Sequence, residues 1–254
     1  MSQGKLYGVG VGPGASDLMT MRSINVLRKV DVIAIPQSSP HVKSVAWRIA
    51  EKAVGPVEGQ ERIFLHFPMT RDPEQTVPAW NIAFAEIETR LKAGKSVAFI
   101  TEGDPLFFST YIYLHTHAKE KWPEVEIEVV PAVSSFTAVP SIIQTPIADG
   151  QERVAVIPAS YGLDDLPAIF RLFDTVLLMK VSSVMPEVVK ILEDENLLEC
   201  SYYVSRATME FEKVVRDLRS IQNDKCDYFS MIVVSKRGRS GILAGRVASE
   251  TLGA

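Results

Sequence analysis

The feature that most constrains the fold is a short apolar run, Val97–Ile100, followed closely by Gly103-Asp104-Pro105. An uninterrupted apolar run of this length is typical of a strand buried on both faces, as in a parallel sheet. Open α/β sheets bind their ligands where such strands end. Gly103 permits close backbone approach, Pro105 fixes a turn, and Asp104 can cap the next helix or contact a ligand. The alternative is an ordinary connecting turn without chemistry.

Strand-like and helix-like segments alternate along the chain, which predicts an α/β fold. We expect a first α/β domain over residues 1–145 and a second, with a mixed sheet, over residues 146–254, because Pro146 and Gly150 mark a linker at 144–152. The strands are expected at 6–11, 32–35, 62–67, 97–100, 126–130, 153–157, 175–179, 201–204, 212–215 and 230–234. Helices are expected from about 20, at 43–52, 80–93 and about 107–121, from about 136, and at 165–173 and 184–194, with a loop over 69–78.

The amino-acid composition limits the classes of protein to which this chain can belong. Of the 254 residues, 46% are hydrophobic and 23% charged, and the formal net charge is −4, which is ordinary for a globular protein and unlike a basic nucleic-acid binder. No apolar run reaches the roughly 18 residues of a membrane span, and the N-terminus lacks the apolar core of a signal peptide. Cys200 and Cys226 lie in unrelated contexts, which suggests a reducing compartment. We therefore expect a cytoplasmic protein with no nucleic-acid or membrane partner.

A glycine-rich stretch follows the first expected strand. Gly10, Gly12 and Ala15 have the spacing of the dinucleotide-binding fingerprint. However, Pro13 removes a backbone donor, and the next helix is expected several residues later, whereas the fingerprint opens directly into a helix. Asp31, at the distance of the ribose-binding acid, precedes the second strand instead of following it. A nicotinamide or flavin enzyme is therefore the weaker alternative.

Four stretches together carry a family resemblance. They are Gly8-Val-Gly-Val-Gly-Pro-Gly-Ala-Ser-Asp-Leu-Met-Thr20, Thr101-Glu-Gly-Asp-Pro105, Pro131-Ala-Val-Ser-Ser-Phe-Thr-Ala138 and Leu177-Leu-Met-Lys180. In this order and spacing they resemble the tetrapyrrole (corrin/porphyrin) methyltransferases, which use S-adenosylmethionine (SAM), over nearly the whole chain. The loop Pro36-Gln-Ser-Ser39 and the run Tyr228–Val234 make the chain most similar to members that methylate carbon C20 of precorrin-2, or of its cobalt-bearing counterpart cobalt-factor II, on the route to cobalamin.

The resemblance implies two α/β domains with a SAM-binding cleft between them, usually in a homodimer. SAM is then the methyl donor and a reduced tetrapyrrole the substrate. Any cobalt belongs to the substrate, and no protein-bound metal is expected. By position, the residues implied to contact SAM are Pro13, Gly103, Asp104, Pro105, Phe107, Ser134, Ser135, Met179, Ala207 and Thr208.

In the methyl transfer that the resemblance implies, the main task of the protein is to align the reacting atoms. The electron-rich macrocycle supplies the nucleophilic carbon, so the protein aligns C20 with the methyl group and its sulfur. Asp104 is the candidate catalytic residue, either as the base that removes the C20 proton or as a group that stabilises the sulfonium charge. The alternative is that Asp104 shapes the turn and binds the cofactor only.

An acidic protein needs a local basic patch to bind the many carboxylates of a tetrapyrrole. The first candidates are His41, Lys43 and Arg48, and Arg62, His66 and Arg71 lie nearby in the sequence. Two other functions stay open: a sister methyltransferase that acts at another ring position, and a non-catalytic protein that binds SAM or another ligand.

Overall fold

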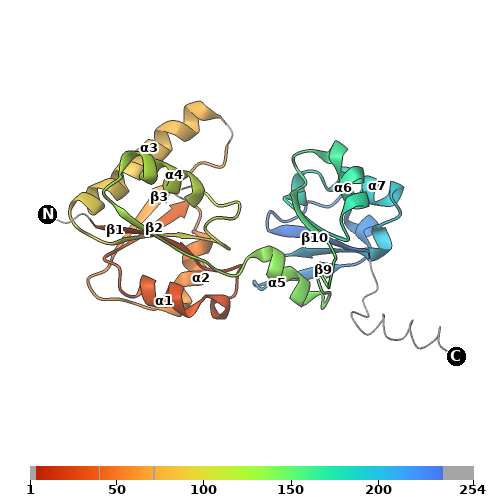
Figure 1. The fold of residues 1–254 in the computed structure, drawn as a ribbon, viewed down its shortest axis with the longest axis horizontal. Helices are drawn as coiled ribbons and strands as arrows, with labels where there is room; N and C mark the ends of the chain where they lie inside the picture. Colours follow the sequence, from red (N-terminus) through yellow and green to blue (C-terminus); the bar gives the residue numbers. More distant parts are fainter. Residues whose placement is uncertain (1–3, 40, 71, 237–254) are drawn as a thin grey trace. The chain divides into compact units, whose positions relative to one another are not determined.

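The computed structural model describes residues 4–39, 41–70 and 72–236. The chain divides between Ser135 and Phe136 into two compact units (Figure 1). The sequence predicts this boundary ten residues later, after residue 145. The difference arises because helix α5 (Ser135–Ile142) packs with the second sheet, where its Val139 lies in the same apolar cluster as Leu177.

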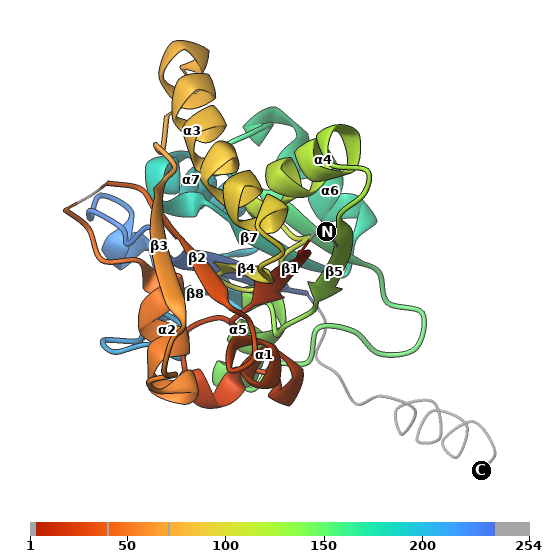
Figure 2. The ribbon, with the colours of Figure 1, turned by 90° about the vertical axis from the view of Figure 1, so that its left-hand side faces the viewer.

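In the described residues, the first unit contains a five-stranded sheet in the order β3-β2-β4-β1-β5. Each pair of neighbouring strands is parallel, so the carboxyl ends of the strands share one edge of the sheet (Figure 2). Every residue of β4 is buried, as its apolar run predicts. The strands are β1 (Lys5–Gly10), β2 (Val32–Gln37), β3 (Glu61–His66), β4 (Val97–Thr101) and β5 (Glu126–Val130).

Two pairs of helices cover the two faces of this sheet (Figure 2). On one face, Leu27 of α1 and Ile49 of α2 lie in one apolar cluster. On the other face, Ile87 of α3 and Leu114 of α4 lie in a second cluster. The helices are α1 (Met21–Leu27), α2 (Val45–Val54), α3 (Pro73–Lys92) and α4 (Tyr111–Lys121). This layered arrangement is the expected α/β architecture.

Helix α3 begins seven residues before its expected start at Trp80, within a stretch that the prolines mark as a loop. Asp72 caps the helix, because its side chain accepts a hydrogen bond from the Glu74 N–H at 3.0 Å. Pro73 occupies the first helical position, where no N–H bond is needed, and Pro78 lies inside the helix, where it costs one backbone bond. The loop prediction for residues 69–78 is therefore wrong from residue 73 onward.

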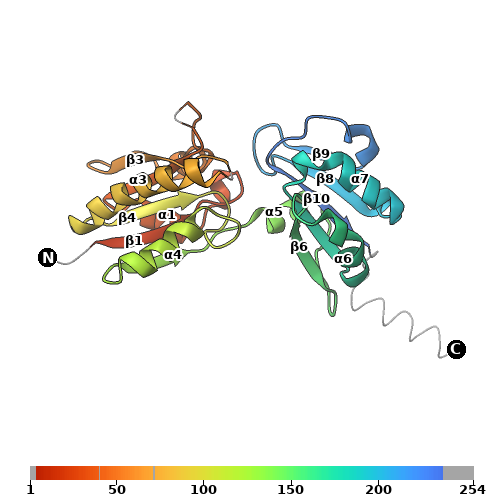
Figure 3. The same cartoon turned by 90° about the horizontal axis from the view of Figure 1, so that it is seen from above.

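In the described part of the chain, the second unit contains a five-stranded mixed sheet in the order β6-β7-β10-β8-β9 (Figure 3). β6 and β7 are parallel, and the other pairs are antiparallel. Helices α6 and α7 cover one face of this sheet, and α5 covers the other. The elements are β6 (Val154–Pro158), α6 (Leu166–Leu172), β7 (Thr175–Met179), α7 (Met185–Asp194), β8 (Ser201–Ser205), β9 (Lys213–Val215) and β10 (Ser230–Ser235). Among the helices that the structure describes, none has the length and apolar character to cross a membrane.

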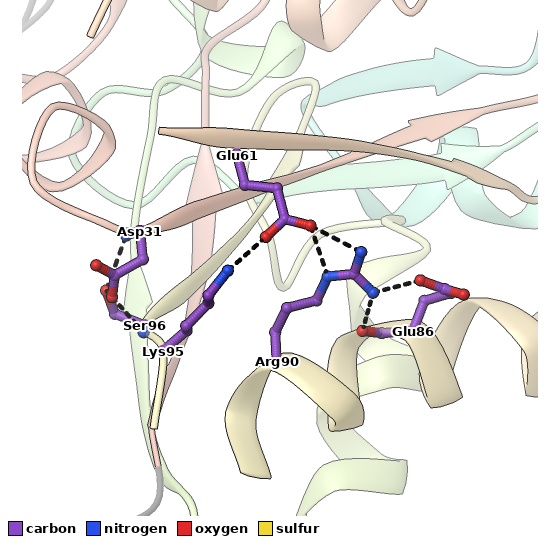
Figure 4. Close-up of polar contacts among 6 residues, drawn as sticks. All are labelled: Asp31, Glu61, Glu86, Arg90, Lys95 and Ser96. Atoms are coloured by element: carbon purple, nitrogen blue, oxygen red, sulfur yellow. Dashed lines mark hydrogen bonds and ion pairs between the residues drawn. The ribbon is translucent and has the colours of Figure 1, made fainter. Parts of the chain in front are cut away.

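A network of charged side chains fixes the edge of the first sheet at which β2, β3 and β4 begin (Figure 4). Glu61 accepts hydrogen bonds from Lys95 Nζ at 2.8 Å and from Arg90 Nη2 at 2.7 Å and Nε at 3.0 Å. Asp31 Oδ2 accepts bonds from the Ser96 N–H and hydroxyl, both at 2.7 Å. The bonds from Lys95 and Arg90 lower the pKa of Glu61, and the bonds from Ser96 lower the pKa of Asp31.

The Glu61→Gln variant is expected to lower the free energy of unfolding by roughly 0.5–1 kcal/mol near neutral pH, a modest loss because the interaction is partly solvent-screened. The folded-state pKa of Glu61 is depressed, so its stabilisation is present above the ordinary carboxyl pKa of about 4 and is lost as pH falls through the lower folded value. In urea unfolding, the free energies of unfolding of wild type and variant should therefore differ at neutral pH and become equal in acid. Glu58→Gln, at an exposed loop residue, is the control and should match wild type. A difference that stays equal at both pH values would contradict this.

Candidate functional site

Two loops are hydrogen-bonded to each other where β1 and β4 end. Gly12 and Gly103 form an isolated antiparallel bridge, in which the Gly103 N–H donates to the Gly12 carbonyl at 2.8 Å and the Gly12 N–H to the Gly103 carbonyl at 3.4 Å. The Val11 N–H donates to the Thr101 carbonyl at 3.0 Å. The glycine-rich stretch and the Gly103-Asp104-Pro105 turn are therefore held together by backbone hydrogen bonds. After Gly12 come a single 3-10 turn (Ser16–Leu18) and then α1 from Met21, so the glycine stretch does not open directly into a helix.

Gly10, the last residue of β1, lies where three loops converge. A Cβ atom at this position would lie 2.5 Å from the Ala132 Cβ, 2.6 Å from the Gly103 carbonyl oxygen and 3.0 Å from the Pro105 Cδ. Each of the first two distances is too short for any real contact, and the carbonyl oxygen belongs to the backbone. Only glycine therefore lets the loops after β1, β4 and β5 approach this closely.

The Asp104 carboxylate joins the loop after β4 to the loop after β5. Its Oδ1 accepts a hydrogen bond from the Leu106 N–H at 2.9 Å, which makes an Asx turn. Its Oδ2 accepts a hydrogen bond from the Ala132 N–H at 3.0 Å, across 28 residues of sequence. Both oxygens thus bind backbone donors, and the carboxylate holds the loops after β4 and β5 in a fixed relation.

The turn presents an open backbone face. Gly103 has a φ of +63°, and a Cβ atom added there would meet no described atom within 4 Å. Its bridge partner Gly12 has a φ of +84°, so both glycines lie in the left-handed region that other residues rarely adopt. A turn that is fixed by hydrogen bonds on one side and open on the other can bind a ligand through its backbone. This geometry fits the SAM contact implied for Gly103.

Three side-chain hydroxyl groups form hydrogen bonds at the bases of the two loops, and the sequence analysis did not predict these bonds. Ser23 of α1 is fully buried and donates to the Gly10 carbonyl at 2.8 Å. The hydroxyls of Thr101 and Ser109 are 2.9 Å apart, and Ser109 Oγ also accepts from the Tyr111 N–H at 3.0 Å. The Tyr111 bond begins α4 at Tyr111, four residues after the expected start near Phe107. Isolated serines and threonines carry no sequence signal that identifies these bonds.

Glu102 is a second acid at the end of β4 that the sequence did not single out. Its Oε1 accepts a hydrogen bond from the Ala46 N–H at 3.0 Å, at the N-terminus of α2. Burial raises the pKa of Glu102. The carboxylate satisfies one of the free N–H groups at the helix start and so connects α2 to the turn that contains Asp104.

The remaining first-unit candidates for SAM contact lie in or next to these loops. Pro13 is buried directly after Gly12, and Pro105 is buried directly after Asp104. The Phe107 ring lies 4.7 Å from the ring of Phe108, measured between centroids. Ser134 is buried in the segment after β5, and Ser135 begins α5. Hydrogen bonds connect the loops that contain Pro13, Gly103, Asp104 and Pro105.

The second-unit candidates lie at two strand ends of the mixed sheet. Met179 ends β7, and its carbonyl accepts from the Ala159 N–H at 2.7 Å. Ala207 and Thr208 follow β8, and Thr208 has a φ of +63° while its N–H donates to Glu212 Oε2 at 2.7 Å. Met179 and Ala207 pack against the same apolar cluster, on the face of the sheet that α5 covers.

Two of the basic candidates line a hollow of about 480 Å³, which Lys43 and His66 share with Gln37 and Phe64. His41 is exposed in the loop after β2, and Arg48 is exposed on α2. Arg62 stacks on the Trp47 ring at 4.7 Å, near the start of β3 and away from the carboxyl ends of the strands. Arg71 lies outside the described residues. Sequence reasoning missed Phe64, although an aromatic residue at an outward position of an alternating strand was the available signal.

Within the described ranges, no group of three or more His, Cys, Asp or Glu side chains is arranged to hold a metal ion.

Several curated proteins with similar sequences are named as C(20)-methyltransferases. The chain is 34% identical to the cobalt-precorrin-2 C(20)-methyltransferase of Salmonella typhimurium, over 92% of this chain and 97% of that protein. It is 27% identical to the precorrin-2 C(20)-methyltransferase of a Sinorhizobium species, over 91% of this chain and 95% of that protein.

Solved structures of such enzymes share the fold. A cobalt precorrin-4 methyltransferase matches with a TM-score of 0.69 and 23% identity, over 91% of this chain and 94% of that one. The uroporphyrin-III C-methyl transferase of Thermus thermophilus, in complex with S-adenyl homocysteine, matches with a TM-score of 0.65 and 18% identity, over 92% of this chain and 98% of that one. The sequence profile of the tetrapyrrole (corrin/porphyrin) methylases matches residues 5–221, which is most of the chain. With its interlocked glycine loop and Gly103-Asp104-Pro105 turn, this chain therefore belongs to the tetrapyrrole (corrin/porphyrin) methylases.

Proposed function

We propose that this protein transfers the methyl group of SAM to carbon C20 of cobalt-factor II or of metal-free precorrin-2. The observation that carries the proposal is the set of loops after β1, β4 and β5, which Gly10, the Gly12–Gly103 bridge and the Asp104 carboxylate hold together. Two near full-length relatives named for C20 methylation support the choice of ring position. A cobalt-bearing substrate is the first choice, because the relative named for cobalt-precorrin-2 is more similar to this chain than the relative named for precorrin-2.

SAM, when bound, supplies a methyl group on a positively charged sulfur that leaves with the bonding electrons. The C20 carbon forms the new bond and then loses its proton. The protein holds the two reacting atoms in line and keeps their distance short. In this proposal the open face of the Gly103 turn contacts SAM, with Pro13, Pro105, Phe107, Ser134 and Ser135 beside it. Met179, Ala207 and Thr208 are the proposed contributions of the second unit.

Asp104 is proposed to position the SAM-binding loops. Both carboxylate oxygens bind backbone N–H groups, which favours the structural role of Asp104 over the role of proton acceptor. Each oxygen retains a second lone pair, so an interaction with the positive sulfonium is compatible with this role. His41, Lys43 and Arg48 stay the proposed substrate-binding residues. We further propose that the protein is a homodimer and that it is located in the cytoplasm.

The test is anaerobic turnover, followed by mass spectrometry, with SAM and either cobalt-factor II or precorrin-2. The expected result is a mass gain of one methyl group, which NMR then assigns to C20, with faster turnover of the cobalt-bearing substrate. A methyl group at another ring position would identify a sister methyltransferase. SAM binding measured by calorimetry, without methylation of either substrate, would identify a binding protein without this activity.

A further inference from the structure

The hollow that Lys43 and His66 line lies at the carboxyl ends of β2 and β3. Gln37 is the last residue of β2 and His66 the last residue of β3, and the two are paired across the sheet. They line the hollow together with Phe64 and Lys43. The hollow is therefore at the same edge of the sheet as the Gly103 turn. Since neighbouring strands lie about 4.8 Å apart, the end of β3 is roughly 10 Å from the end of β4, with β2 between them.

Phe64 forms an exposed apolar surface in this hollow. Ile63 and Leu65 face the apolar core under α3, and the alternation along β3 turns Phe64 and His66 to the opposite face. The Phe64 side chain is 54% exposed, although it lies on a strand of the sheet. Large exposed aromatic residues beside cations are typical of sites that bind a ligand with both apolar and anionic parts.

Lys43 gives the hollow a positive charge, His66 adds ring nitrogens that can hydrogen-bond, and none of the four lining residues is acidic. Among the described residues, neither side chain makes an ion pair. Gln37 Nε2 donates to the Val42 carbonyl at 3.2 Å and so fixes the segment next to Lys43 against the end of β2. The start of α2 lies nearby, but two of its backbone N–H groups are already used. The Trp47 N–H donates to the Ser44 hydroxyl and the Ala46 N–H donates to the Glu102 carboxylate.

We propose that this hollow is a specificity subsite that binds one carboxylate side chain of the tetrapyrrole substrate. Lys43 and His66 bind the carboxylate, and Phe64 contacts the apolar edge of the macrocycle. A tetrapyrrole is a flat, largely apolar ring with carboxylates on its periphery, so it matches an aromatic wall flanked by a lysine and a histidine. The inference rests on the proposed function for the identity of its ligand, and it concerns how the substrate is anchored and oriented. Gln37 acts as a positioning residue, because it fixes the loop that contains Lys43.

The experiment measures tetrapyrrole binding separately from turnover. Cobalt-factor II is titrated anaerobically into the full-length protein and followed by its absorbance, while SAM affinity is measured by calorimetry. Lys43→Gln is expected to weaken cobalt-factor II binding about tenfold, as for a lost charge-assisted hydrogen bond, and to raise the KM for the tetrapyrrole by a similar factor. His66→Gln and Phe64→Ala are expected to weaken it several-fold. SAM affinity should not change in any of the three variants.

Matched controls remove the same groups elsewhere in the first unit. Lys52→Gln removes an exposed lysine near the other end of α2, and Ile82→Ala removes a 68% exposed apolar side chain on α3. Both controls should bind cobalt-factor II within about twofold of wild type. Equal binding by Lys43→Gln and wild type, or no binding by wild type, would overturn the subsite. Tight binding by wild type without methylation would instead overturn the proposed function, and the variants would still test the subsite.

Discussion

Gly10→Ala is expected to lower methyl transfer at least about tenfold at subsaturating SAM concentrations and to destabilise the fold. The new methyl group would lie 2.6 Å from the Gly103 carbonyl oxygen and 2.5 Å from the Ala132 Cβ, so at least two of the three loops must separate. Overpacking of this kind costs roughly 1–3 kcal/mol. Because the displaced groups belong to the proposed SAM site, we expect SAM affinity to fall at least about tenfold, which corresponds to 1.4 kcal/mol.

Two further variants separate the effect on the site from the effect on stability. Gly59→Ala places a side chain at a φ of +73°, with no described atom within 4 Å of the new Cβ. It should cost about 1–2 kcal/mol from backbone strain alone and leave SAM affinity unchanged. The double variant Gly10→Ala/Ala132→Gly removes one of the two clashes and should recover part of the SAM affinity. Calorimetry and urea unfolding measure both quantities. Normal SAM affinity in Gly10→Ala would show that the convergence of the loops is not needed for binding.

The strands of the first unit could be predicted because each one has a local signal. The apolar run of β4 and the segment 126–130 of β5 are clear without tertiary information, and the observed strands match them closely. The start of α3 could not be predicted, because Asp72 acts as a helix cap only once Pro73 takes a helical conformation. The expected boundary after residue 145 differs from the observed division after Ser135, because the sequence of α5 contains no signal for the sheet on which it packs.

The candidate site could be predicted only in part, for a similar reason. Gly103, Asp104 and Pro105 are recognisable as a turn at the end of a buried strand, and the resemblance adds Pro13 and Ser134. The bonding partners of these residues depend on the strand order, which places β1 between β4 and β5. Without that order, nothing in the sequence brings Asp104 near the Ala132 N–H, or the Glu102 carboxylate near α2.

Asp104→Asn is expected to weaken SAM binding about tenfold or more while turnover at saturating SAM stays within a few-fold of wild type. An asparagine can still accept from the Leu106 N–H, but its Nδ2 group would then face the Ala132 N–H, so two donors oppose each other. Loss of a hydrogen bond to a charged group costs about 1.5–3 kcal/mol, here in the connection between two loops of the proposed SAM site.

Asp72→Asn is the matched control for this variant. Asp72 Oδ1 accepts from the Glu74 N–H at 3.0 Å in the same two-residue pattern as Asp104. Its Oδ2 accepts from the nearby Gln75 side chain at 2.8 Å, and among the described residues it makes no bond to a second loop. This control should therefore keep both SAM affinity and turnover, since asparagine caps a helix as well as aspartate does. Calorimetry for SAM and single-turnover kinetics distinguish the two roles of Asp104. Unchanged SAM affinity with turnover reduced by orders of magnitude would contradict the positioning role and would assign Asp104 to removal of the C20 proton.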